Sequence, residues 1–99
     1  MTAVDDQLDG IERAQQRARA ELVLAPARVA RRRYLQALAA AHYVDLGRLE
    51  VDDELAIQRA AHALTAAGAP LRWECVTVPT ADQYLAGHKI NHPPTVRIP

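Results

Sequence analysis

The sequence predicts a small, mostly helical α+β domain. Helix-periodic patterns occupy most of residues 1–68, and apolar and polar residues then alternate between Pro70 and Pro79. The final stretch, residues 88–99, contains three prolines and carries no helix signal. We therefore expect one domain over residues 1–87 and an extended, proline-rich tail over 88–99.

The first expected helix carries a heptad-like apolar pattern. Acidic residues gather near its start, where the helix dipole favours negative charge, and Gly10 within it costs about 1 kcal/mol relative to alanine. A helix weakened in this way is expected to pack on a neighbour. The apolar positions form a seam of about three heptads, with Gln15 at one step. Its members are Val4, Leu8, Ile11, Ala18 and Leu22.

Pro26 interrupts this pattern and leaves two interpretations open. Residues 27–43 are helix-forming and contain neither Gly nor Pro, so Pro26 either kinks one long helix or lies near the start of a second. No Ser, Thr, Asp or Asn stands just before Pro26 to cap a new helix, which favours the kinked continuation. Gly47 is the expected stop signal at the C-terminal end.

A further helix is bracketed by signals at both ends. Asp52 is the expected N-cap, and Gly68 follows the last periodic residue as the expected C-terminal stop. The inward face of this helix consists mostly of small side chains, which allow another backbone to approach closely. These residues are Ile57, Ala60, Ala61, Leu64 and Ala67.

The next segment predicts a β-strand over residues 71–78. Leu71, Trp73 and Cys75 alternate with polar residues, β-branched residues follow, and Pro79 ends the run.

A short helix and an edge strand are expected after it. Thr80 and Gln83 form a capping-box pattern, and Gly87 closes the helix that this pattern begins. In the tail, the β-branched residues of 95–98 mark a candidate second strand at the edge of the sheet.

Composition argues against catalysis. The chain has no serine, and its single cysteine has no partner for an intramolecular disulfide. Phosphate-binding loops, paired-cysteine zinc signatures and nucleophile elbows are all missing from the sequence. His88 and His92 have the spacing of two ligands on a helix, but adjacent Gly and Pro argue against a helix there. We expect no enzymatic activity, cofactor, metal or small-molecule substrate.

The sequence also indicates a compartment. No stretch approaches the ~20 apolar residues of a membrane span, and the N-terminus is acidic where a signal peptide is basic. We expect a cytoplasmic protein, or one packaged in a virion that is assembled in the cytoplasm. The excess of alanine, and of arginine over lysine, is typical of a GC-rich genome and favours an actinobacterial or actinobacterial-phage source.

Arginine is concentrated in residues 13–33, which hold seven arginines and a single acid. At about 100° per residue, five of these arginines share one helix face, opposite the apolar seam. That face suits a solvated surface, an acidic protein partner or a nucleic acid, although the zero net charge of the whole chain argues against general polyanion binding. The five are Arg13, Arg17, Arg28, Arg31 and Arg32.

Two functional hypotheses follow. In the first, the protein is a non-enzymatic structural or interaction protein, a small subunit of a larger assembly such as a phage virion or an accessory complex. It would self-associate or bind a protein partner through the helix seam and the extended tail. In the second, it is a small nucleic-acid-binding regulator that uses the basic face. The interface residues of the first hypothesis are Val4, Leu8, Ile11, Leu22, Val96 and Ile98.

Overall fold

The structure is a computed structural model that describes the backbone of residues 3–97 and the side chains of residues 9–97. Its elements in chain order are α1 (Ala3–Ala41), α2 (Glu54–Ala66), the 3₁₀ turn η1 (Trp73–Cys75) and α3 (Ala81–Leu85). Since residues 3–97 contain no strand, the predicted α+β class is wrong, and the described chain is all-helical with long connections.

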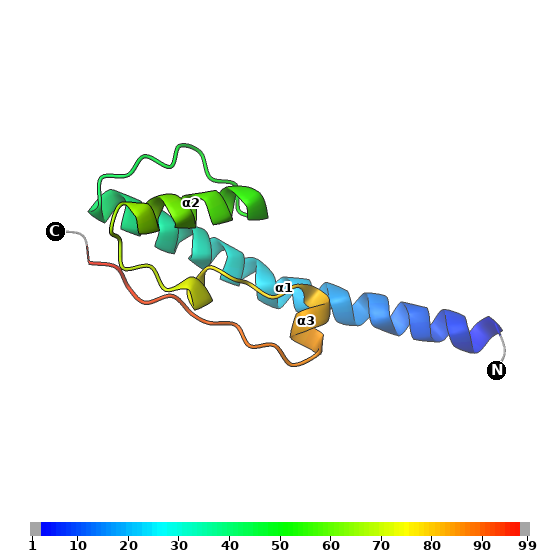
Figure 1. Ribbon diagram of the computed structural model, residues 1–99. Coiled ribbons are helices and arrows are strands. Elements are labelled where there is room, and N and C mark those ends of the chain that lie inside the picture. Colours follow the sequence, from blue (N-terminus) through cyan, green and yellow to red (C-terminus); the bar gives the residue numbers. More distant parts are fainter. Residues whose placement is uncertain (1–2, 98–99) are drawn as a thin grey trace.

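Helix α1 sets the shape of the molecule. It contains 39 residues, which at 1.5 Å per residue gives a length of about 58 Å. The molecule measures 61 × 21 × 17 Å, with a radius of gyration of 17.3 Å, whereas a compact domain of this size has about 13 Å. The N-terminal part of α1 extends well beyond the other elements, as Figure 1 shows.

Helix α1 runs through Pro26 without a break, so a single helix replaces the two that a hairpin would require. Proline lacks the N–H that would bond to the carbonyl of Leu22. The Leu22 side chain is 76% exposed, so this turn of the helix faces solvent, where water can take the place of the missing donor.

The helix ends earlier than the glycine signal predicts. Tyr43 adopts a left-handed φ of 56°, and the amide of Val44 donates to the carbonyl of Ala39 at 2.9 Å. This is the Schellman-type bond that usually places glycine at the left-handed position. Gly47, the predicted stop, lies in the following loop with a φ of 63°.

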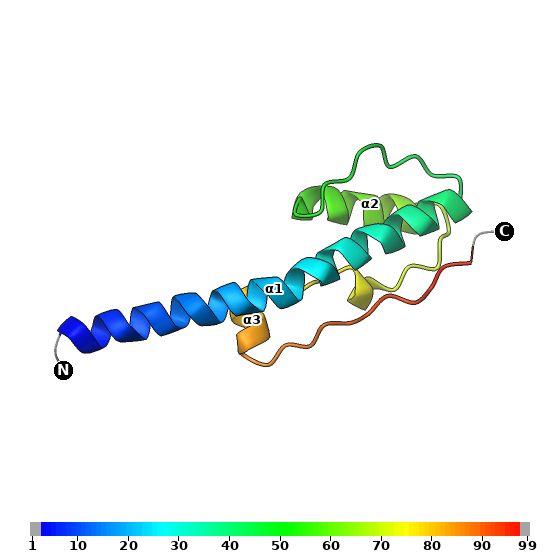
Figure 2. The ribbon, with the colours of Figure 1, turned by 180° about the vertical axis from the view of Figure 1, so that it is seen from behind.

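Helix α2 packs beside the C-terminal half of α1. The connection over residues 42–53 runs back along α1, so that the two helices point in about the same direction (Figures 1 and 2). The N-cap is Asp53, one residue beyond the predicted Asp52, and its carboxylate accepts from the Ala56 amide at 3.0 Å. Small residues at the contact let the backbones approach. The core that results includes Leu35, Leu38, Ile57, Ala60, Ala61 and Leu64.

The predicted strand over residues 71–78 is absent. Cys75 and Val76 are buried side by side, which is incompatible with a two-residue period, and Trp73 is partly exposed. Within residues 3–97 no strand pairs with this segment, and side chains bond to its backbone instead: the Arg72 amide donates to the Tyr34 hydroxyl, and the Val76 carbonyl accepts from Arg31. The segment instead forms the turn η1, in which Cys75 and Val76 are buried in the core, and Leu71 packs against that core from the preceding connection.

The capping box of α3 is confirmed. The Thr80 hydroxyl accepts from the Gln83 amide, and the Gln83 side chain accepts from the Thr80 amide. Where α3 lies against the middle of α1, Ala20 and Leu24 are buried. After Gly87 the chain returns along α1 as an extended segment up to residue 97, without the predicted edge strand. The division of the chain at residue 87 remains a prediction.

Candidate interaction surface

The projecting part of α1 is in contact with solvent on every side. All residues from 9 to 19 are exposed, and Ile11 among them is 54% exposed. Leu22, three residues beyond this part, is 76% exposed. Together with two exposed alanines at heptad spacing they form a line on one face of the helix, with Gln15 at the one polar step. We call this line the apolar stripe; its members are Ile11, Ala18, Leu22 and Ala25.

The apolar stripe lies on the opposite face of α1 from the core of its own chain. The buried positions of α1 recur at Ala20, Leu24, Arg31, Leu35 and Leu38, and this face is rotated by about 150° from the stripe. The seam predicted to pack on a neighbour therefore has no neighbour within the described chain. Val4 and Leu8 continue its register toward the N-terminus, but their side chains lie outside the described residues.

The arginine-rich face of α1, which was predicted to lie on the surface, is in part the face that packs against the core. Arg31 is 0% exposed, although it was expected on the surface. Its guanidinium forms a bidentate pair with the Glu54 carboxylate, at 2.9 and 2.8 Å, and donates to the carbonyls of Val76 and Val51. A planar fork with several donors suits this position, because it joins α1, the N-terminus of α2 and the turn η1.

The other four predicted arginines are divided between ion pairs and solvent. Arg17 pairs with Asp82 at the start of α3, at 3.0 Å between exposed side chains. Arg13 is exposed and Arg32 is half-buried. Arg28 is considered with its partner below.

Arg28 forms an ion pair with Glu21 at 2.7 Å. The hydrogen bond from Arg28 lowers the pKa of Glu21 and, reciprocally, the bond to Glu21 raises the pKa of Arg28. With Arg31 buried and both Arg17 and Arg28 paired to acids, the predicted basic face is not a continuous positive surface.

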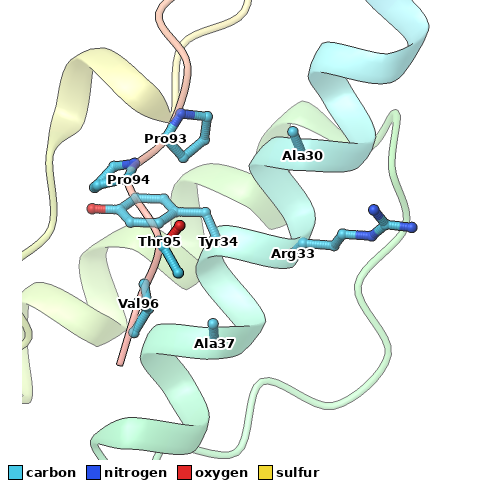
Figure 3. A pocket seen from close by; sticks show the side chains of 8 residues that line it. All are labelled: Ala30, Arg33, Tyr34, Ala37, Pro93, Pro94, Thr95 and Val96. Atoms are coloured by element: carbon cyan, nitrogen blue, oxygen red, sulfur yellow. The ribbon is translucent and has the colours of Figure 1, made fainter. Parts of the chain in front are cut away.

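The tail lies on its own chain, and its contact with α1 is shown in Figure 3. The tail crosses the ring of Tyr34, with Pro94 and Thr95 beside the ring and Val96 further along toward Ala37, while the Arg33 side chain points away from the tail. Val96 is half-buried and packs against the core. The predicted interface residue Val96 is therefore used within the chain, and Ile98 lies outside the described residues.

The histidines and the single cysteine are spread over several elements of the described chain. Within the described residues no group of three or more His, Cys, Asp or Glu side chains could hold a metal ion. His62 packs against Trp73 with ring centroids 5.0 Å apart. Burial raises the pKa of the Cys75 thiol, with the charge of Glu74 acting in the same direction and Arg72 opposing it.

Comparisons with known proteins leave the surface without a precedent. The chain matches no family model, no curated protein and no solved structure. Among the described residues, no helix is both long enough and apolar enough to cross a membrane.

The sequence patterns single out neither Glu54 nor Tyr34, and both are central to the packing. Glu54 is the carboxylate partner of Arg31. Tyr34 is buried, and its hydroxyl accepts from the Arg72 amide at 2.9 Å. Tyr34 and Leu38 are four residues apart, a helical spacing that could have predicted that both face the core. The pattern is hard to recognise because a charged residue, Arg31, lies on the same face.

Proposed function

We propose that this protein is a non-enzymatic structural or interaction protein, a small subunit of a larger assembly, and that it binds a protein partner through the apolar stripe. The observation that carries the proposal is the exposure of this stripe on a face of α1 that the described chain leaves uncovered. Ile11 and Leu22 are more than half exposed on this face, although both belong to a regular heptad pattern.

The energetics of the helix support a partner. Isolated helices shorter than about 12–15 residues are marginal in water, and most helical stability in proteins comes from packing of an apolar face. Residues 9–19 have no such packing in the described chain, and Gly10 lowers their helix propensity further. A partner on the stripe supplies the missing burial, at roughly 25 cal/mol per Å² of apolar area.

The proposed source and compartment rest on the sequence. The excess of alanine, and of arginine over lysine, is typical of a GC-rich genome. It supports a phage virion component or an accessory protein of an actinobacterium, acting in the cytoplasm or in a particle assembled there. The tail contributes as an internal strap through Val96, which leaves Ile98 as its remaining candidate contact with a partner.

The test is a photo-crosslinking amino acid placed in the full chain, expressed in the cells that naturally encode it. At Ala18, on the stripe, it should give protein adducts of defined mass that disappear when Leu22→Glu is added. The matched control carries the crosslinker at Arg13, an exposed position on the other face of the same helix, and should give none. Absence of adducts at Ala18, or nucleic-acid adducts at Arg13, would refute the proposal.

A further inference from the structure

We propose that the occupant of the apolar stripe is a second copy of this chain, whose α1 packs antiparallel against the first. This inference rests on the proposed function and names the partner. It depends on three observations: the register of the stripe, the charges beside it and the position of the rest of the molecule.

The register of the stripe is symmetric. Heptad spacings of four and three run without interruption from Val4 to Val29, and the midpoint falls between Gln15 and Ala18. An antiparallel copy in this register places Ile11 opposite Leu22 of the second copy, and Leu22 opposite its Ile11. At the centre, each Gln15 faces Ala18 of the other chain. The small alanine leaves room for the Gln15 amide, and a polar residue in such a seam fixes register.

The charges beside the stripe select the antiparallel direction. Glu12 and Arg19 are exposed and lie seven residues apart on the same flank of the stripe. In the part of the chain that the structure describes, neither forms a salt bridge. The antiparallel register brings Glu12 beside Arg19 of the second copy, and twofold symmetry repeats the pair. A parallel pair would bring Glu12 beside Gln7 and Arg19 beside Ala14, with no ion pair.

The rest of the molecule leaves this face open. Helices α2 and α3 pack on the opposite face of α1, which carries the buried residues Leu24, Arg31 and Leu38. The shared segment from residue 4 to residue 29 spans about 39 Å of helix. In the dimer, the projecting end of each α1 lies along the uncovered face of the other α1, and the two apolar stripes bury each other.

The first experiment is sedimentation equilibrium of the full chain over micromolar to submillimolar concentrations. The wild type should be a dimer that dissociates on dilution, Leu22→Glu should be a monomer, and Arg13→Glu should behave as the wild type. A wild type that stays monomeric throughout would overturn the inference. In that case, partner adducts at Ala18 that contain another protein would leave the proposed function standing, and no adducts would refute both.

The second experiment tests direction with separate Ile11→Cys and Leu22→Cys chains, mixed and oxidised gently. The antiparallel dimer should give mainly the mixed disulfide between residues 11 and 22, whereas a parallel dimer would give residue 11 with 11 and residue 22 with 22. Cys75 stays in place as an internal control, because it is buried in the folded chain. Predominance of the like pairs would overturn the antiparallel arrangement.

The third experiment exchanges charges. Glu12→Arg and Arg19→Glu should each raise the dimer dissociation constant about tenfold, because each variant puts two like-charged pairs at the interface. The double variant Glu12→Arg/Arg19→Glu should return close to the wild-type value, since the pairs are restored in reverse. If the double variant is no tighter than the single ones, Glu12 and Arg19 do not meet.

Discussion

The two halves of α1 differ in how they use the same helix. From residue 23 to Ala41 the helix inserts Leu24, Leu35 and Leu38 into the core, whereas over residues 9–19 it buries no side chain. Both halves carry apolar residues at helical spacing, but on opposite faces. The core face begins at Ala20, before the apolar stripe ends at Ala25, so α1 has two apolar faces where the halves overlap.

This overlap shows what a second apolar face implies. A helix that served only its own core would be polar on its outer face. Here the outer face keeps heptad order through Leu22, while the inner face depends on α2, α3 and the tail. The inner face stabilises the chain, and the outer face remains available for association.

Arg31 provides the largest expected effect on the inner half. Arg31→Ala should lower the free energy of unfolding by about 3 kcal/mol, because it leaves a cavity and removes the donors to the carbonyls of Val51 and Val76. Glu54 is mostly exposed and regains water, which limits the loss. Urea unfolding followed by circular dichroism measures the difference. The control Arg33→Ala, at an exposed position, should stay within about 0.5 kcal/mol of the wild type.

The comparison of the halves is tested most directly by two leucines of the same helix. Leu24 is 0% exposed and Leu22 is 76% exposed. Leu24→Ala should cost about 2–3 kcal/mol of unfolding free energy through lost burial and a cavity, whereas Leu22→Ala should cost less than about 0.5 kcal/mol in the monomer. Thermal unfolding at the lowest workable concentration checks both. Equal losses would mean that the outer face also supports the monomer.

A concentration series separates the two roles further. If the stripe pairs with a second copy, the wild type should become more stable as the protein concentration rises, because dimerisation stabilises the folded state by mass action. Leu22→Ala should gain less, so the difference in stability between the two should widen with concentration. Leu24→Ala should show a deficit that is already present in the monomer.

Local signals in the sequence predicted where helices begin and end better than they predicted which segments pack together. The box at Thr80 and Gln83 and the stop at Gly68, whose φ is 81°, depend on neighbouring residues only and are found as expected. The strand over residues 71–78 failed because alternation does not reveal whether a second strand is present to accept its hydrogen bonds. That depends on the tertiary arrangement around Tyr34.

The candidate site was only partly predictable for the same reason. Heptad spacing locates the line through Ile11 and Leu22, but spacing alone does not tell an inner face from an outer one. The arginines at 28 and 31 were interpreted as surface because charged residues are rarely buried without partners. The partner that makes burial of Arg31 possible is Glu54, 23 residues away, and helical periodicity within α1 contains no information about it.

The smallest expected effect concerns the ion pair at the boundary between the halves. The hydrogen bond from Arg28 lowers the pKa of Glu21 below its usual value, so the stability from this pair is present above the unfolded pKa of glutamate and is lost as pH falls through the folded pKa. In a titration of the Glu21 side chain by nuclear magnetic resonance, Arg28→Gln should move the midpoint upward, toward the ordinary glutamate value. Arg33→Gln is the matched control and should leave it unchanged. Because Glu21 is exposed, high salt should also raise the wild-type midpoint. A midpoint that does not respond to Arg28→Gln would mean that the two halves of α1 are not linked through this pair, and that Pro26 separates them more completely than the continuous helix indicates.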